Sequence, residues 1–215
     1  MKPQNSSKRT YDSSRRKKQA RQTRLQIIEA ARKLFTERGY SGATIEAIAQ
    51  EANVAVETIY ASFGNKREIL TRLISVSLVG DDDPTPLLQR QGPLKVMQEK
   101  NQRRQIQLFA IDMTEIMGRV ASLFEVMRSA AKNEPEITTI LQKILEERLG
   151  GMKVFIRALM SNGPLRDEIS LEEAAETTWV LSSGEVYSLL VVDRGWSTEK
   201  YSRWLASALS NLLLP

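Results

Sequence analysis

Apolar residues recur every three to four positions along most of the chain, and this spacing constrains the fold more than any other feature of the sequence. Leu25, Ile28 and Phe35 follow it near the start, and Leu205 and Leu209 follow it near the end. Side chains at that interval share one face of an α-helix, whereas a half-buried strand alternates between apolar and polar residues. Because the sequence has no alternating segment of useful length, it predicts an all-α fold.

Glycine, proline and capping residues divide this pattern into separate helices. Asn65, Asn133 and Ser170 each begin a capping-box sequence, and Thr44 and Ser197 are good N-caps for two further helices. We therefore expect helices at 21–38, 44–52, 56–63, 65–79, 94–100, 104–132, 134–160, 171–192 and 197–213.

Charge is distributed unevenly along the chain. Residues 1–24 hold nine Lys or Arg and one acid, residues 25–80 are balanced, and residues 81–215 hold 16 basic and 19 acidic residues. The composition before about Lys18 is typical of a segment without stable structure. We predict a flexible basic arm at 1–20, a first helical domain at 21–81 and a larger helical domain at 82–215, with the proline-containing break at 80–86 between the two domains.

The absence of cysteine and histidine excludes several kinds of chemistry. Disulfides, thiolate or imidazole metal sites, cysteine nucleophiles and Ser-His-Asp triads all require one of these residues. We also find no glycine-rich phosphate loop, and the three acids at 81–83 are typical of a solvated linker. We therefore expect no enzymatic activity, no metal and no cofactor. No apolar run approaches the roughly 20 residues that span a bilayer, so we expect a cytoplasmic protein without a membrane partner.

The spacing of Ala49, Asn53 and Ile59 predicts a helix-turn-helix unit at 44–63. A small residue such as Ala49 lets two helices approach closely. Four residues later the turn needs a positive φ angle, which asparagine tolerates better than most residues. Six residues further on, Ile59 would face the first helix. The outer face of the second helix would then be exposed, as in DNA-reading proteins, although a helical hairpin inside an all-α core has the same spacing.

Three longer motifs surround this unit, and together they are specific: Ala31-x-x-Leu34-Phe35-x-x-x-Gly39-Tyr40, Thr44-x-x-x-Ile48-Ala49-x-x-Ala52, and Val54-x-x-x-Thr58-x-Tyr60-x-x-Phe63-x-x-Lys66-x-x-x-Leu70. With these motifs, residues 21–80 resemble the DNA-binding domain of TetR-type transcriptional regulators. The chain departs from the family pattern at Asn53, Ala55, Glu57 and Ser62, where the family often has glycine, serine, glycine and histidine. The changes in the second helix mean that no operator sequence can be carried over.

The resemblance implies roles for individual residues. Thr44, Thr58, Tyr60 and Lys66 would contact phosphates. Val56 and Glu57 would reach base edges, although Glu57 is equally well explained as a solvated helix charge. The basic segment from Arg15 to Arg24 would contact the DNA backbone or an adjacent minor groove. The DNA-binding residues that we predict are thus Arg24, Thr44, Val56, Glu57, Thr58, Tyr60 and Lys66.

The resemblance also implies a three-helix helix-turn-helix domain joined by a fourth helix to a larger helical domain for ligand binding and dimerisation. Adaptable apolar side chains could line a ligand pocket there, or could simply form the core: Phe109, Met113, Met117, Phe124, Met127, Met152, Phe155, Trp179 and Tyr187. Acids within apolar faces, namely Asp112, Glu115 and Glu185, would select a cationic ligand if buried and are otherwise surface charges.

The stretch at 171–192 is apolar on more than one side, which favours an interface with a second copy over coverage by another helix of the same chain. The interface residues that we predict are Trp179, Ser183, Val186, Leu190, Leu205, Leu209 and Leu212. The sequence thus predicts a homodimeric repressor that binds a palindromic double-stranded DNA operator and is released by a small apolar effector. An architectural DNA-binding protein or an activator without a ligand is the alternative.

Overall fold

The computed structural model describes residues 7–167 and 169–215, and all regular elements in these ranges are helices. The described chain forms two compact units, which divide between Leu73 and Ile74. The all-α fold predicted from the apolar spacing is therefore confirmed. Residues 1–6 of the predicted arm lie outside the described residues.

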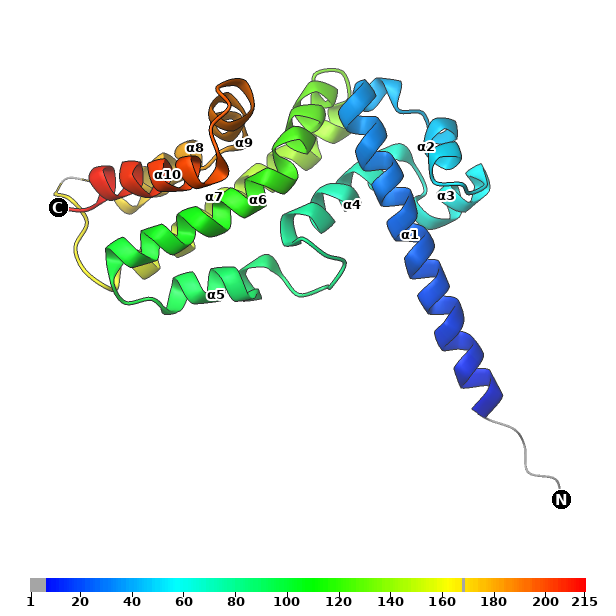
Figure 1. Ribbon diagram of the computed structural model, residues 1–215, viewed down its shortest axis with the longest axis horizontal. Helices are drawn as coiled ribbons and strands as arrows, with labels where there is room; N and C mark the ends of the chain where they lie inside the picture. The colour runs from blue at the N-terminus through cyan, green and yellow to red at the C-terminus, as the bar shows by residue number, and fades with distance from the viewer. Residues whose placement is uncertain (1–6, 168) are drawn as a thin grey trace. The chain divides into compact units, whose positions relative to one another are not determined.

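The first unit contains α1 (Ser7–Gly42), α2 (Ile45–Glu51), α3 (Val56–Phe63) and the beginning of α4 (Lys66–Val79) (Figure 1). Its core is aliphatic apart from the stacked rings of Phe35 and Tyr40. The fully buried side chains include Ile27, Phe35, Ile48, Ile59 and Leu70. Four helices of this length provide enough apolar area to order the short α2 and α3, which would not be stable alone.

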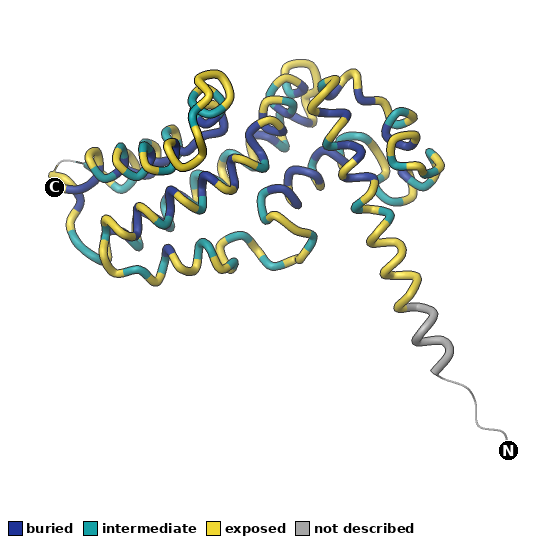
Figure 2. The backbone as a smooth tube through the Cα atoms, viewed as in Figure 1, coloured by how far each residue is buried: buried dark blue, intermediate teal, exposed yellow. Residues whose placement is uncertain are grey.

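Helix α1 begins at Ser7, so our expectation of an unstructured segment before about Lys18 and a helix start at Arg21 was wrong for the described residues. Lysine, arginine, glutamine and alanine, which dominate 15–21, all have high helix propensity and extend a helix that is already anchored by Ile27 and Ile28. The side chains of residues 14–22 are all exposed, as Figure 2 shows along the outer part of α1. At its other end α1 is interrupted at Gly39, where φ is 68°.

The second unit is built around the long helix α6 (Gln102–Ala131). The other elements that follow α4 are η1 (Leu87–Gln89), α5 (Gln91–Gln98), α7 (Pro135–Met160), α8 (Leu171–Leu181), α9 (Gly184–Tyr187), the π-helical η2 (Ser188–Asp193) and α10 (Thr198–Leu213). Helix α6 packs against α5, α7, α9 and α10, so its buried residues form the centre of this unit.

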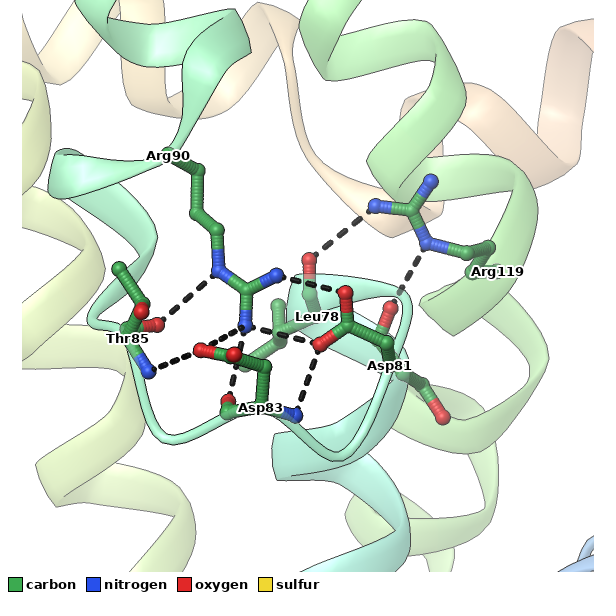
Figure 3. Close-up of polar contacts among 7 residues, drawn as sticks. Leu78, Asp81, Asp83, Thr85, Arg90 and Arg119 are labelled. Atoms are coloured by element: carbon green, nitrogen blue, oxygen red, sulfur yellow. Dashed lines mark hydrogen bonds and ion pairs between the residues drawn. The ribbon is translucent and has the colours of Figure 1, made fainter.

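The boundary between the units differs from the one that we predicted at residue 82. The end of α4 already packs into the second unit, because a side chain of α6 caps the last carbonyl groups of α4. The Arg119 guanidinium donates from Nε to the Ser77 carbonyl at 2.9 Å and from Nη2 to the Leu78 carbonyl at 3.2 Å (Figure 3). The proline-containing segment is therefore a loop within the second unit rather than a linker between domains.

Most predicted helix caps are confirmed. The Thr44 Oγ1 accepts from the Ala47 N–H at 3.1 Å, and the Asn65 Oδ1 accepts from the Glu68 N–H at 2.9 Å. Ser170 forms a complete capping box with Glu173. The box predicted at Asn133 was wrong: Pro135 takes the first helical position of α7, which makes Glu134 the N-cap residue, and Glu134 has no side-chain cap.

The single helix predicted at 171–192 is divided at Ser182 and Ser183. The Ser182 hydroxyl donates to the Thr178 carbonyl at 2.7 Å, and the Ser183 Oγ accepts from the Val186 N–H at 3.3 Å. Serine competes in this way for backbone groups that a continuous helix would use. Gly184 then approaches α6 closely, because a Cβ added there would lie 3.5 Å from the Ala121 Cα. Helix α5 also differs, since it begins at Gln91 rather than near residue 94.

Candidate DNA-binding surface and ligand cavity

The turn between α2 and α3 has the geometry that the sequence predicts. Asn53 has a positive φ of 53°, and among the described residues it is the non-glycine residue with this conformation. The Val54 N–H donates to the Ala49 carbonyl at 3.0 Å, which closes the turn. Ala49 and Ile59 are both buried between the helices. Helices α2 and α3 therefore form a helix-turn-helix unit within 44–63.

Helix α3 presents a nearly uncharged outer face. Tyr60 is 51% exposed. Glu57 is exposed, and Val56, Thr58 and Ser62 are half-buried. The N-cap residue Ala55 makes no side-chain cap hydrogen bond, as its side chain predicts. The donors and apolar groups on this face are of the kinds that contact phosphates and base edges.

Two further predicted contacts flank α3. Thr44 is exposed at the N-terminus of α2, where backbone N–H groups and the helix dipole favour an anion. Lys66 is half-buried at the start of α4 and already has internal contacts: its Nζ donates to the Tyr40 carbonyl at 2.8 Å and lies 4.2 Å from the centre of the Tyr40 ring. Lys66 therefore also holds the end of α1 against α4. Arg24 is exposed on α1.

The second unit contains a cavity of about 560 Å³. Its lining comes from the end of α4, residues 86–97, α6 and α7. Phe109 and Phe155 both line it and stack on each other with ring centres 4.1 Å apart. Six of the nine side chains that we predicted for a pocket line it: Phe109, Met113, Met117, Phe124, Met152 and Phe155.

The other three predicted pocket residues lie elsewhere. Met127 is buried in the core, and Tyr187 packs edge-on against Tyr201 and lines a separate groove beside α10. Trp179 lies over Arg148, whose guanidinium carbon is 5.1 Å from the ring centre. Sequence reasoning placed these three by residue type alone, and residue type does not distinguish a cavity wall from plain core.

Sequence reasoning also missed much of the lining. Ile74 and Leu78 on α4, Pro86 and Leu87 in the loop, and Gly151 on α7 all face the cavity. The loop residues follow a break that we interpreted as a linker. Gly151 could have been identified from the sequence. A glycine inside a helix costs about 1 kcal/mol relative to alanine, so its presence indicates a special environment. A Cβ at Gly151 would meet no atom within 4 Å, so the residue borders open space.

The acids and bases near the cavity have different environments. Asp112 lines the cavity, and burial together with repulsion from Glu115 raises the pKa of its carboxyl to about 6. Glu115 and Glu185 are exposed, and Glu185 pairs with Arg128. Arg148 also lines the cavity, and burial lowers the pKa of its guanidinium to about 10. Arg148 donates to the Trp179 carbonyl at 2.6 Å and to the Ser182 hydroxyl at 3.0 Å.

The predicted interface residues divide into two groups. Leu205 and Leu209 are fully buried in their own chain, so including them in a surface for a second copy was wrong. They occupy the side of α10 that packs on α6 and α8. Leu212 is exposed, Trp179, Val186 and Leu190 are half-buried, and Ser183 is nearly buried. Three apolar residues that we did not predict are also exposed nearby: Val180, Leu189 and Val192.

Metal-binding and membrane-spanning features are not found in the described parts of the chain. No cluster of three or more acidic side chains there is arranged to hold a metal ion. No helix among the described residues is long and apolar enough to cross a bilayer.

A helix-turn-helix unit with an exposed second helix, followed by a helical unit with a cavity, defines a class of DNA-binding regulators. Comparison with known proteins is more specific. Residues 27–73 match the family described as "Bacterial regulatory proteins, tetR family". The chain is 25% identical over 208 residues to the HTH-type transcriptional repressor BepR of Brucella suis biovar 1 (strain 1330), covering 94% of this chain and 97% of that protein. Over residues 27–73 the chain therefore carries a DNA-binding domain of the TetR type, and the relative that it resembles along nearly its whole length is a transcriptional repressor.

Solved structures share the fold. The transcriptional regulator FadR from Bacillus subtilis, in complex with stearoyl-CoA, superposes with a TM-score of 0.68 at 19% identity, over 86% of this chain and 96% of that one. A transcriptional regulator from Saccharomonospora viridis in complex with choline gives a TM-score of 0.67 at 18% identity, over 90% of this chain and 98% of that one. At these identities the likeness is one of fold.

Proposed function

We propose that the protein is a ligand-responsive, dimeric repressor that binds a palindromic operator through α3. The observation that carries this proposal is the exposed, nearly uncharged outer face of a helix-turn-helix second helix. Such a helix enters the major groove with its N-terminal residues at base edges. Val56 and Glu57 are then the base contacts, and Thr44, Thr58, Tyr60 and Lys66 contact phosphates.

Dimerisation would pair two of these helices on a two-fold symmetric site. Half-sites lie about 34–36 Å apart when two recognition helices read successive turns of one DNA face. Exposed apolar side chains on α8, η2 and α10 support an interface there: Val180, Leu189, Val192 and Leu212. We keep Trp179 and Leu190 in that interface because they lie on α8 and η2, and Ser183 and Val186 because they lie at the start of α9, between these elements.

The cavity supports a small-molecule effector. A volume of about 560 Å³ is within the range of ligand pockets in proteins, and most of its lining is apolar. BepR carries the name of a repressor, and the two similar structures hold ligands as unlike as stearoyl-CoA and choline. The ligand would favour one of two states of the regulator and DNA the other, so each would weaken the binding of the other.

The DNA-binding part is tested by titrating a fluorescent operator duplex, selected from genomic fragments, with Tyr60 variants. Tyr60→Ala should weaken binding about 10- to 100-fold, since it removes a phosphate donor and an apolar contact. Tyr60→Phe should lose about half of that free energy, because only the hydroxyl is removed. The exposed ring should leave the melting temperature unchanged in both variants. Undiminished affinity of Tyr60→Ala would show that α3 does not face the DNA.

A further inference from the structure

Three charged side chains interrupt the apolar wall of the cavity in the second unit: Asp112, Glu147 and Arg148. Asp112 belongs to α6, where its neighbours Phe109, Met113 and Ile116 line the same cavity. It also borders a second depression of about 360 Å³, which is lined by residues of η1, α5 and α6. Asp112 therefore stands where the apolar cavity meets a more polar one.

The Asp112 carboxylate forms no ion pair within the described residues, although the charge of Arg119 favours its ionised form. No hydrogen bond or ion pair there reaches it, and burial raises its pKa to about 6. It packs against Gly92 at the start of α5, where an added Cβ would collide with the carboxylate. An ionised group that is buried without a partner destabilises a fold, and such groups are found mainly where function requires them.

The basic residues around Asp112 either form hydrogen bonds with other groups or are exposed to solvent. Arg90, in the polar depression, donates to both Asp81 oxygens at 2.7 and 2.9 Å and to the Asp83 carbonyl at 2.8 Å (Figure 3). Arg119, two helical turns further along α6, donates hydrogen bonds to the Ser77 and Leu78 carbonyls (Figure 3). Lys95 on α5 is exposed to solvent.

The other charged residues of α6 and α7 near Asp112 form no ion pair with it either. Glu115 repels it and lies outside the apolar cavity. Glu147 of α7 pairs with Lys143 at 3.9 Å. The Arg148 guanidinium is directed to the Trp179 carbonyl and the Ser182 hydroxyl. The cavity wall thus carries two acids, Asp112 and Glu147, and one base, Arg148, whose guanidinium is directed to neutral oxygens away from Asp112.

We propose that the cavity binds an amphipathic cation, with its apolar body against Phe109, Met113 and Phe155 and its ammonium or similar cationic group on the Asp112 carboxylate. This inference rests on the proposed ligand-responsive function and narrows the effector from any small apolar molecule to a positively charged one. A cation supplies the partner that the carboxylate lacks, and a neutral ligand leaves it unpaired. An anionic head group would be repelled by Asp112 and Glu147, which both line the cavity.

Three probes with the same chain length test the proposal: decyltrimethylammonium, decanol and decanoate, each titrated calorimetrically into the full-length protein below micelle-forming concentrations. The cation should bind at least about ten-fold more tightly than the alcohol, and the carboxylate more weakly than either. The affinity for the cation should fall as the pH drops below about 6, where Asp112 takes up a proton, while the affinity for the alcohol stays constant.

Variants separate the carboxylate from the cavity. Asp112→Asn should remove the preference for the cation and leave decanol binding intact, whereas Glu125→Gln, exposed on the same helix and outside the lining, should change neither. Gly151→Phe should fill the cavity and abolish binding of all three probes, since open space lies beside that residue. Gly150→Phe is the matched control on the exposed side of α7.

The outcomes distinguish the inference from the proposed function. Loss of the cation preference in Asp112→Asn alone would support both. Equal binding of the cation and the alcohol, or a preference that persists in Asp112→Asn, would overturn the inference and leave a ligand-binding regulator. If no probe binds while operator binding is intact, the proposed effector function fails and this inference fails with it.

Discussion

Asp112 affects stability as well as the proposed ligand binding, because its carboxylate is partly buried and forms no ion pair in the described part of the chain. Its pKa is raised from 3.8 to about 6 in the folded protein. The folded state therefore binds a proton more tightly than the unfolded state. Ionisation of Asp112 destabilises the fold above about pH 6, and this penalty disappears as the pH falls toward about 4.

Asp112→Asn should thus stabilise the protein at pH 8 by about 1 kcal/mol, after allowance for the solvent that reaches the carboxyl group. The melting temperature would rise by about 2–4 °C for a chain of this size. The difference between the variant and the wild type should shrink toward zero as the pH approaches about 4. Thermal unfolding at a series of pH values measures it, and a constant difference across the series would contradict the assignment of the raised pKa to Asp112.

Single residues were predictable where the reason was local. The positive φ of Asn53, the caps at Thr44 and Ser170, and the missing cap at Ala55 all follow from side-chain chemistry within four residues. The cavity walls were not predictable in this way. Met127 and Met117 are alike in the sequence, yet Met117 lines the cavity and Met127 does not, because that depends on packing against helices far away in the chain.

At the scale of elements, α1 has the largest consequence for binding. Its outer part is a helix with the side chains of Arg15, Arg16, Lys17 and Lys18 exposed, rather than the flexible arm that we expected. A helix holds these charges at fixed positions, so they lose less conformational freedom on meeting DNA than a disordered arm would. We therefore expect them to contact phosphates without contributing to sequence preference.

Replacing Arg15, Arg16, Lys17 and Lys18 with glutamine should reduce the dependence of operator affinity on salt. Each phosphate contact contributes about 0.9 to the slope of log K against log salt, so loss of two contacts per protomer lowers the slope of a dimer by roughly 4. Glutamine preserves helix propensity, which keeps α1 intact. Lys95→Gln with Lys100→Gln, in the second unit, is the control with a smaller charge loss. An unchanged slope in the quadruple variant would show that these residues do not touch DNA.

The elements that differ from prediction do so for tertiary reasons. The serines at 182 and 183 divide the predicted helix because their hydroxyls take backbone partners in a buried setting beside α6, which apolar spacing does not reveal. The loop at 80–86 looked like a linker by composition. Its Asp81 and Asp83 instead hold Arg90, nine and seven residues away in sequence, and so order the segment that leads into the cavity wall.

At the scale of the whole molecule, the net charge of +5 is distributed over segments that differ in charge and in expected role. The basic N-terminal segment, the nearly uncharged α3 and the slightly acidic second unit predict binding that depends on salt through α1 and on sequence through α3. The resemblance to TetR-type regulators was specific enough in 21–80 to predict the first unit. The second unit was predictable only as a helical domain, because the residues that line its cavity and form its interface depend on packing between distant helices.

Sequencing of genomic fragments retained by the purified full-length protein tests the central claim most directly. If α3 of two protomers reads DNA, the retained fragments will share an inverted repeat whose half-site centres lie about one helical turn apart. Tyr60→Ala should retain fragments without that repeat. Retention without any shared inverted repeat, or the same repeat with Tyr60→Ala as with the wild type, would contradict the assignment of this protein as a regulator that recognises an operator through α3.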